Sequence, residues 1–147
     1  MGYVLPAAFG VAMAAPDRPI VGLTGDGSFA MACGELETIA RYGLPILYLQ
    51  FTNRSLGWIK MLQHLYLEGR YFGVDPGPID YAGVATAMGL EGIRVSSMEE
   101  LEGVVADWVA NRRPIYIDVP VPDQIALPPP VAPWQAALAG QAERPVY

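Results

Sequence analysis

One stretch near the start of the chain, residues 20–29, restricts the possible folds more than any other. An apolar run rich in β-forming residues (20–24) stops abruptly at a four-residue glycine turn, and an amphipathic segment (29–42) follows. The turn has the sequence Gly25-Asp26-Gly27-Ser28. This pattern predicts a buried strand, a tight turn and then a helix. Backbone N–H groups and the positive end of the helix dipole make such a turn a natural phosphate-binding site.

Asp26 is the unusual residue in this turn. A carboxylate between two phosphate-binding glycines repels an anion unless a cation lies between them. Asn53 follows the next predicted strand (46–51), and the carboxyl ends of parallel strands meet at one edge of a sheet. Mg²⁺ prefers oxygen ligands and takes several of them from phosphates and water. The sequence therefore predicts a joint site for a diphosphate and a divalent metal ion that includes Asp26 and Asn53.

Strands and helices alternate along the rest of the chain. Helices are predicted near residues 5–15, 29–42, 58–66 and 81–88, with a further one after a Ser97–Glu100 capping box. Strands are predicted at 20–24, 46–51, 92–95 and 115–119. The alternation indicates the α/β class, a three-layer, doubly wound parallel sheet. Because proline is frequent after residue 120, we expect a domain at residues 1–123 and a docking or disordered Pro-rich tail at 124–147.

Composition and charge argue against a nucleic-acid ligand, a membrane span and an internal disulfide. The net charge of −6, with no basic cluster, argues against nucleic acid as a ligand. No apolar run reaches the roughly 18 residues of a membrane span, and no secretory signal is evident, so a cytoplasmic location is expected. The single cysteine, Cys33, excludes an internal disulfide, and its place in a predicted helix favours an inert core thiol.

Two other interpretations of the glycine turn remain open. A Gly-Asp-Gly turn after a strand is often only structural. The spacing Gly25-x-Gly27-x-x-Ala30 also fits a relaxed dinucleotide-binding fingerprint. Against a dinucleotide, Asp26 occupies the place of the pyrophosphate, and the second predicted strand does not end in the acidic residue that would hold a ribose.

Several separated motifs together resemble the C-terminal domain of thiamine-diphosphate enzymes of the acetolactate synthase-like family. Asn53 lies twenty-seven positions after Asp26, and this spacing is similar to the family's diphosphate-and-magnesium motif. The resemblance covers roughly residues 1–123. Its other motifs are Met1-Gly2-Tyr3-Val4-Leu5-Pro6-Ala7-Ala8, Glu35-Leu36-Glu37-Thr38, Arg41-Tyr42-Gly43-Leu44-Pro45, Leu56-Gly57, Arg70-Tyr71, Asp80-Tyr81-Ala82 and Ala87-Met88-Gly89.

The resemblance implies thiamine diphosphate and Mg²⁺ as cofactors and a set of residues that hold them. It implies that Asp26, Asn53 and the carbonyl of Ser55 ligate Mg²⁺. Met1 falls at the family position whose side chain supports the bent cofactor, and 2-oxo acids are the implied substrates. The residues implied to surround the diphosphate are Gly25, Gly27, Ser28, Leu56 and Gly57.

The sequence also departs from the family pattern. In the family that the sequence resembles, the glutamate that activates the cofactor lies in a separate pyrimidine-binding domain. The resemblance does not place that domain within these 147 residues, so no catalytic residue is assigned, and a pyrimidine-domain partner and an oligomer are expected. Leu62 replaces a substrate-selecting tryptophan of acetohydroxyacid synthases, and Thr52 replaces the first asparagine of an Asn-Asn pair. His64 and Trp58 are weaker candidates for substrate contact. A non-catalytic remnant that serves only association is the remaining alternative.

Overall fold

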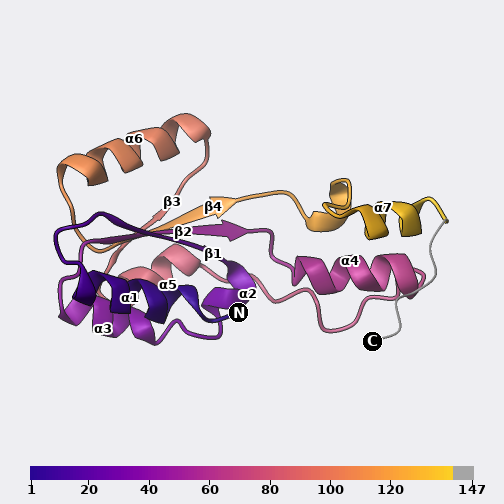
Figure 1. Ribbon diagram of the computed structural model, residues 1–147, viewed down its shortest axis with the longest axis horizontal. Helices are drawn as coiled ribbons and strands as arrows, with labels where there is room; N and C mark the ends of the chain where they lie inside the picture. Colours follow the sequence, from indigo (N-terminus) through magenta and orange to yellow (C-terminus); the bar gives the residue numbers. More distant parts are fainter. Residues whose placement is uncertain (141–147) are drawn as a thin grey trace. The chain divides into compact units, whose positions relative to one another are not determined.

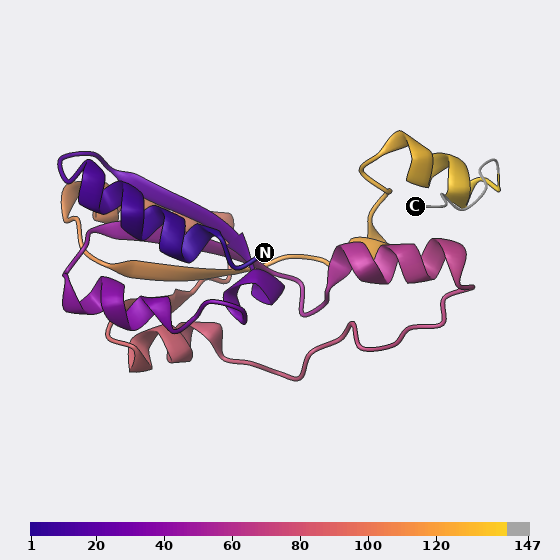
Figure 2. The ribbon, with the colours of Figure 1, turned by 60° about the horizontal axis from the view of Figure 1, so that its bottom comes forward.

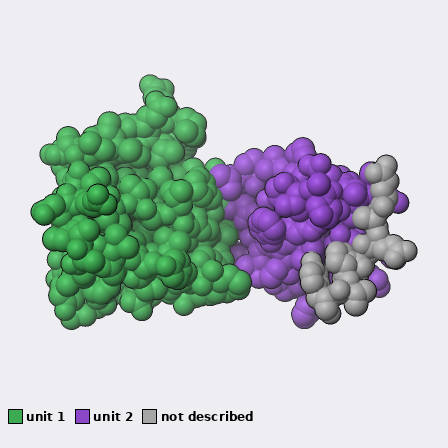
Figure 3. Space-filling model, viewed as in Figure 1, with its two compact units in different colours: residues 1–52, 79–120 green, residues 53–78, 121–147 purple. Residues whose placement is uncertain are grey.

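The structure is a computed structural model that describes residues 1–140. It divides into two compact units, which Figure 3 shows in different colours. Unit 1 comprises residues 1–52 and 79–120, and unit 2 comprises residues 53–78 and 121 onward. The predicted boundary at residue 123 is a single point along the chain, whereas unit 2 is assembled from two segments that unit 1 separates. Residues 141–147, the end of the predicted tail, lie outside the described residues.

Unit 1 is built on a four-stranded parallel sheet. Its strands are β1 (Ile20–Gly25), β2 (Ile46–Thr52), β3 (Glu91–Arg94) and β4 (Ile115–Pro120), in the order β1-β2-β4-β3. In the register, Gly25 of β1 pairs with Phe51 of β2, and Phe51 pairs with Val119 of β4. The adjacent β1 and β2 therefore end at the same edge, and Asp26 and Asn53 directly follow their last residues.

Helices cover both faces of this sheet, as Figure 1 shows. On one face lie α1 (Val4–Ala14), α3 (Glu35–Arg41) and α5 (Tyr81–Ala87), and on the other lies α6 (Met98–Ala110). Figure 2 is turned to bring the side with the three helices forward. The predicted three-layer α/β fold with a parallel sheet is confirmed.

Each face of the sheet has its own hydrophobic core. The larger core packs α1, α3 and α5 against the strands, with Leu5, Leu36, Ile39, Tyr48 and Tyr116 almost completely buried. The smaller core packs α6 against the other face through Leu47, Trp108, Ile115 and Ile117. The central strands β2 and β4 are covered on both faces, and strands of this kind are apolar along most of their length. This explains why the sequence shows nearly continuous apolar runs there rather than alternation.

The single helix predicted at 29–42 is wrong. The structure has a four-residue helix α2 (Asp26–Phe29) and the separate helix α3, joined by turns. Between them the backbone hydrogen bonds connect residues three apart, as from the Ala32 amide to the Phe29 carbonyl (3.0 Å). Gly34, at the start of α3, is a poor helix former, and this favours the break. Cys33 lies in these turns and packs, partly buried, against the larger core.

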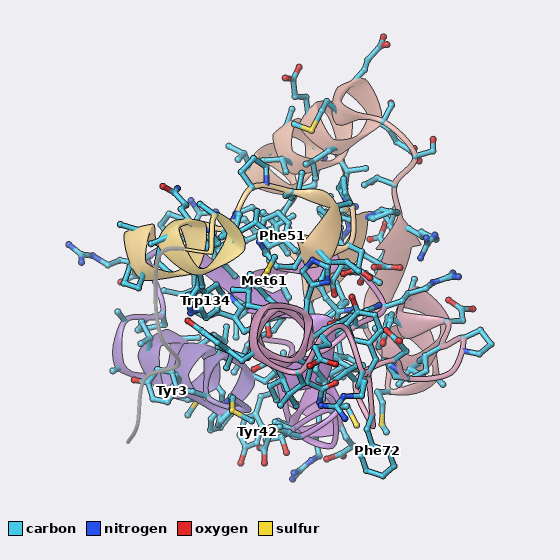
Figure 4. All side chains as sticks on the ribbon, turned by 90° about the vertical axis from the view of Figure 1, so that its right-hand side faces the viewer. Tyr3, Tyr42, Phe51, Met61, Phe72 and Trp134 are labelled. Atoms are coloured by element: carbon cyan, nitrogen blue, oxygen red, sulfur yellow. The ribbon has the colours of Figure 1, made fainter. Side chains whose placement is uncertain are left out.

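Unit 2 contains α4 (Gly57–Tyr66), the one-turn helix η1 (Gln124–Ala126) and α7 (Ala132–Leu138). Trp58 of α4 meets Trp134 of α7 edge to face, with ring centroids 4.7 Å apart. Figure 4 labels Trp134 and Met61 of this unit, together with Phe72, which is 89% exposed on the segment after α4. Residues 124–140 thus contain short helices within the predicted tail. No helix among the described residues has both the length and the apolar character to cross a membrane.

Candidate functional site

The glycine turn holds a nearly buried carboxylate at the end of β1. Gly25 is extended, with φ −122° and ψ 163°, and Asp26 begins α2. The Asp26 side chain accepts a hydrogen bond from the Gly27 amide at 2.8 Å, and the residue is only 5% exposed. This bond orients the carboxylate within the turn. A carboxylate has about four lone-pair sites, so this hydrogen bond is chemically compatible with ligation of a cation.

Ser28 connects the turn to the start of the chain. Its Oγ accepts a hydrogen bond from the Gly2 amide at 2.8 Å. The hydroxyl of a serine donates one bond as well as accepting two, so Ser28 retains a proton for an anionic oxygen. Met1, the residue predicted to support the cofactor, is adjacent to Gly2 and 88% exposed. The structure thus brings the start of the chain to the glycine turn through Gly2 and Ser28.

The loop after β2 holds the second group of predicted residues. The Asn53 amide oxygen accepts from the Ser55 amide at 3.1 Å, and Arg54 between them has a φ of 55°. This is the turn that asparagine side chains commonly form with the backbone two residues on. A Cβ on Gly57 would lie 2.7 Å from Asn53 Nδ2 and 2.9 Å from Gln124 Cβ. Glycine at 57 therefore allows the chain to pack closely against Asn53.

Two groups of this loop already have partners within unit 2. The Leu56 amide donates to the Val74 carbonyl at 2.7 Å, and the buried Ser55 hydroxyl donates to the same carbonyl at 3.3 Å. Any contact between Leu56 and a diphosphate must therefore use atoms other than its N–H. The prediction for Ser55 involves its carbonyl oxygen, which these bonds do not use.

The predicted ligands suit a hard cation by their chemistry. They comprise one carboxylate, one amide oxygen and one backbone carbonyl, and a metal with such a set completes its shell from phosphates and water. Within residues 1–140 no three His, Cys, Asp or Glu side chains form a cluster that could hold a metal. The predicted set needs no such cluster. The residues on which it depends divide between the units, with Asp26 in unit 1 and Asn53 and Ser55 in unit 2.

A buried polar network in unit 1 was missed by sequence reasoning. Tyr116 donates to the Gln50 side chain at 2.5 Å, Gln50 donates to Thr52 Oγ1 at 2.7 Å, and Thr52 donates to Asp118. Arg94 also donates to Asp118, at 2.5 Å. Burial and, to a lesser degree, the Asp118 charge raise the pKa of Tyr116. The sequence signal that could have predicted this network is the presence of the polar residues Gln50, Thr52 and Asp118 within otherwise apolar strands.

This network joins the ends of the strands that lead to the candidate site. Gln50 and Asp118 are fully buried, and Thr52 is the last residue of β2. Buried polar groups are stabilising only when they are hydrogen-bonded, and the five side chains satisfy one another across β2, β3 and β4. The carboxyl end of β2 is thereby fixed one residue before Asn53.

His64, a weaker candidate, has a local partner. Its Nδ1 lies 2.8 Å from the Tyr71 hydroxyl, and the two rings are stacked. This contact gives the His64 side chain a partner within the chain, so its position does not require a role in ligand binding.

Comparison with known proteins agrees with the fold and the motifs. Residues 1–119 match the family described as "Thiamine pyrophosphate enzyme, C-terminal TPP binding domain". The chain therefore belongs to the thiamine pyrophosphate enzyme family and contains its C-terminal, cofactor-binding domain. The predicted family is confirmed.

The chain is also similar to acetolactate synthases. It is 35% identical over 132 residues to the mitochondrial acetolactate synthase catalytic subunit of Saccharomyces cerevisiae, covering 90% of this chain and 19% of that protein. It is 39% identical over 125 residues to the acetolactate synthase isozyme 3 large subunit of Escherichia coli, covering 82% and 22%. The chain thus spans about a fifth of the length of these relatives.

Proposed function

We propose that this chain supplies the diphosphate- and metal-binding half of the active site of an acetolactate synthase-like enzyme that decarboxylates or joins 2-oxo acids. The observation that carries the proposal is the Gly25-Asp26-Gly27-Ser28 turn directly after β1 in a chain of this family. The similarity to acetolactate synthases supports the choice of 2-oxo acids as substrates.

The proposed roles divide between a metal ion and a diphosphate. Asp26, Asn53 and the Ser55 carbonyl provide oxygen ligands to Mg²⁺, and thiamine diphosphate, when bound, supplies the electron sink for decarboxylation. The buried Asp26 carboxylate and the Asx turn at Asn53 support this assignment, because each holds an oxygen in a defined orientation. The residues proposed around the diphosphate are Gly25, Gly27, Ser28, Leu56 and Gly57, and the Met1 side chain is proposed to support the cofactor in its bent conformation.

The proposal includes a pyrimidine-binding partner that carries the activating glutamate, as a separate chain or a further domain, within an oligomer. The match to this chain covers only 19% and 22% of the length of these two relatives, which supports association with other domains. In addition, β1 lies at an edge of the described sheet, and its Val21 and Leu23 side chains are 52% and 56% exposed. An exposed apolar edge strand offers a surface for another chain.

Substitution of Asp26 tests the metal assignment. In the complex purified from its source cells, Asp26→Asn removes the charged ligand and should weaken Mg²⁺-dependent binding of thiamine diphosphate by more than about 100-fold. Asp17→Asn, on the exposed turn before β1, is the matched control and should bind as the wild type does. Isothermal titration with and without Mg²⁺ measures both.

Three results would contradict parts of the proposal. Undiminished binding by Asp26→Asn would reject Asp26 as a ligand. Failure of the wild-type complex to bind the cofactor would support a non-catalytic remnant. Metal-independent binding of NAD would support a dinucleotide site in its place.

A further inference from the structure

Lys60 is a buried cation of unit 2. The residue lies on α4 and is 8% exposed. Its Nζ is 2.7 Å from Asp75 Oδ1 and 2.7 Å from Asp123 Oδ2. Asp75 belongs to the segment after α4, and Asp123 directly precedes η1. One ammonium group thus joins three parts of unit 2 that are far apart in the sequence.

These bonds define what Lys60 can do chemically. Hydrogen bonds to Asp123 and Asp75 raise the pKa of Lys60 above its ordinary value, so the amine carries its proton at neutral pH. Its charge is directed at two carboxylates, and charge-assisted hydrogen bonds of this kind are stronger than neutral ones. Lys60 therefore suits neither a general base nor an anion-binding group. Its role must follow from what it holds in place.

Asp75 connects Lys60 to the loop of predicted metal and diphosphate residues. Its neighbour Val74 is almost completely buried, and the Val74 carbonyl accepts hydrogen bonds from the Leu56 amide (2.7 Å) and the Ser55 hydroxyl (3.3 Å). On its other side, the loop joins α4, where the Lys60 amide donates to the Leu56 carbonyl at 2.9 Å. The 55–56 backbone is therefore held between its own helix and the Val74–Asp75 segment.

We propose that Lys60 is a positioning residue, whose ion pair with Asp75 and Asp123 holds the Val74 carbonyl against residues 55 and 56. The Ser55 carbonyl and the Asn53 side chain are thereby kept in the orientation in which they bind the metal. This role rests on the proposed function and extends it to a residue that contacts neither cofactor nor substrate.

A second ion-pair triad provides the control. Arg113 of unit 1 pairs with Glu91 and, at 2.8 Å, with Asp107, but all three side chains are at least partly exposed. The Arg113 triad contains one cation and two carboxylates, like the Lys60 triad, but lies away from the predicted site residues in the sequence. Arg113→Met therefore removes a triad with the same charges, and it is expected to leave the 53–57 loop unchanged.

Hydrogen exchange of the full chain tests the proposal without any cofactor. In Lys60→Met, NMR should show the Leu56 amide exchanging at least about tenfold faster, because the Val74 carbonyl is released. Amides inside α4, such as that of His64, and in β2 should change much less, and Arg113→Met should leave Leu56 unchanged. Unaltered exchange at Leu56, or equal acceleration throughout α4, would overturn the positioning role. Should Lys60→Met fail to fold, Asp75→Asn is expected to release Leu56 in the same way.

Cofactor titration provides the second measurement. In the complex purified from its source cells and titrated with thiamine diphosphate in the presence of Mg²⁺, Lys60→Met should weaken cofactor binding about tenfold relative to the wild type, whereas Arg113→Met should not. Binding that is unchanged in Lys60→Met would contradict the positioning role. Absence of binding by the wild-type complex would instead contradict the proposed function, while the exchange experiment would still decide whether Lys60 holds the loop.

Discussion

At the scale of single residues, close contacts of the backbone determine which positions tolerate change. Gly22 in β1 lies under the ring of Tyr48, where a Cβ would be 2.7 Å from Cδ1 and 2.8 Å from Cε1. The Tyr48 hydroxyl in turn donates to the Leu5 carbonyl at 3.0 Å and connects α1 to the sheet. Burial raises the pKa of Tyr48, as expected for a phenol whose ionised form would be poorly solvated. Because glycine has no side chain, position 22 leaves room for the Tyr48 ring to pack against the β1 backbone.

Gly22→Ala should therefore destabilise the protein. The added methyl group overpacks the larger core, and overpacking costs about 1–3 kcal/mol. Gly10→Ala in α1 is the matched control, because a Cβ added at Gly10 would have nothing within 4 Å, and alanine favours a helix interior by about 0.5–1 kcal/mol. Urea unfolding followed by circular dichroism compares the two. Equal stability of both variants would contradict the packing described for Tyr48.

At the scale of elements, most helices and strands were predicted from the sequence, because the apolar runs, glycines and prolines are local signals. The break at Gly34 was missed, since a helical pattern of apolar residues continues across it. The capping box at α6 was only half correct. Ser97 Oγ accepts from the Glu100 amide at 3.1 Å, but the Glu100 carboxylate accepts from the amide and hydroxyl of Ser96, at 2.7 and 2.8 Å. Which neighbouring residue hydrogen-bonds to the Glu100 carboxylate depends on backbone angles, and the spacing of residues in the sequence does not reveal these angles.

The Ser96–Glu100 contact makes a pH-dependent contribution to the start of α6. The bond from the Ser96 amide, and then that from its hydroxyl, hold the pKa of Glu100 below its ordinary value. Because this folded-state pKa is depressed, the contribution is present above the ordinary glutamate pKa of about 4.3 and is lost as the pH falls through the lower folded value. An NMR titration should place the Glu100 midpoint below that of an unstructured glutamate.

Ser96→Ala removes only the hydroxyl bond, so the Glu100 midpoint should rise part of the way back. Ser97→Ala is the control, since the Ser97 hydroxyl bonds the Glu100 amide rather than the carboxylate. A Glu100 midpoint that does not respond to Ser96→Ala would contradict the assigned bond.

At the scale of the whole molecule, the non-local pairings were the part that the sequence could not provide. Lys60 and Asp123 are 63 residues apart, and Trp58 and Trp134 come from the two separate segments that form unit 2. No spacing rule predicts such partners, because any of several acidic or aromatic residues could have filled the role. The glycine turn and Asn53 were predictable, since both follow strands of one parallel sheet. Their joint action on one cofactor is the central proposal.

Native mass spectrometry of the full chain, tagged and purified from its source cells in Mg²⁺ buffer, tests that proposal most directly. We predict a stoichiometric complex in which the chain is bound to a protein with a pyrimidine-binding domain and retains thiamine diphosphate and Mg²⁺. A chain that elutes without thiamine diphosphate, and takes up none when the cofactor and Mg²⁺ are added to the purified complex, would contradict it.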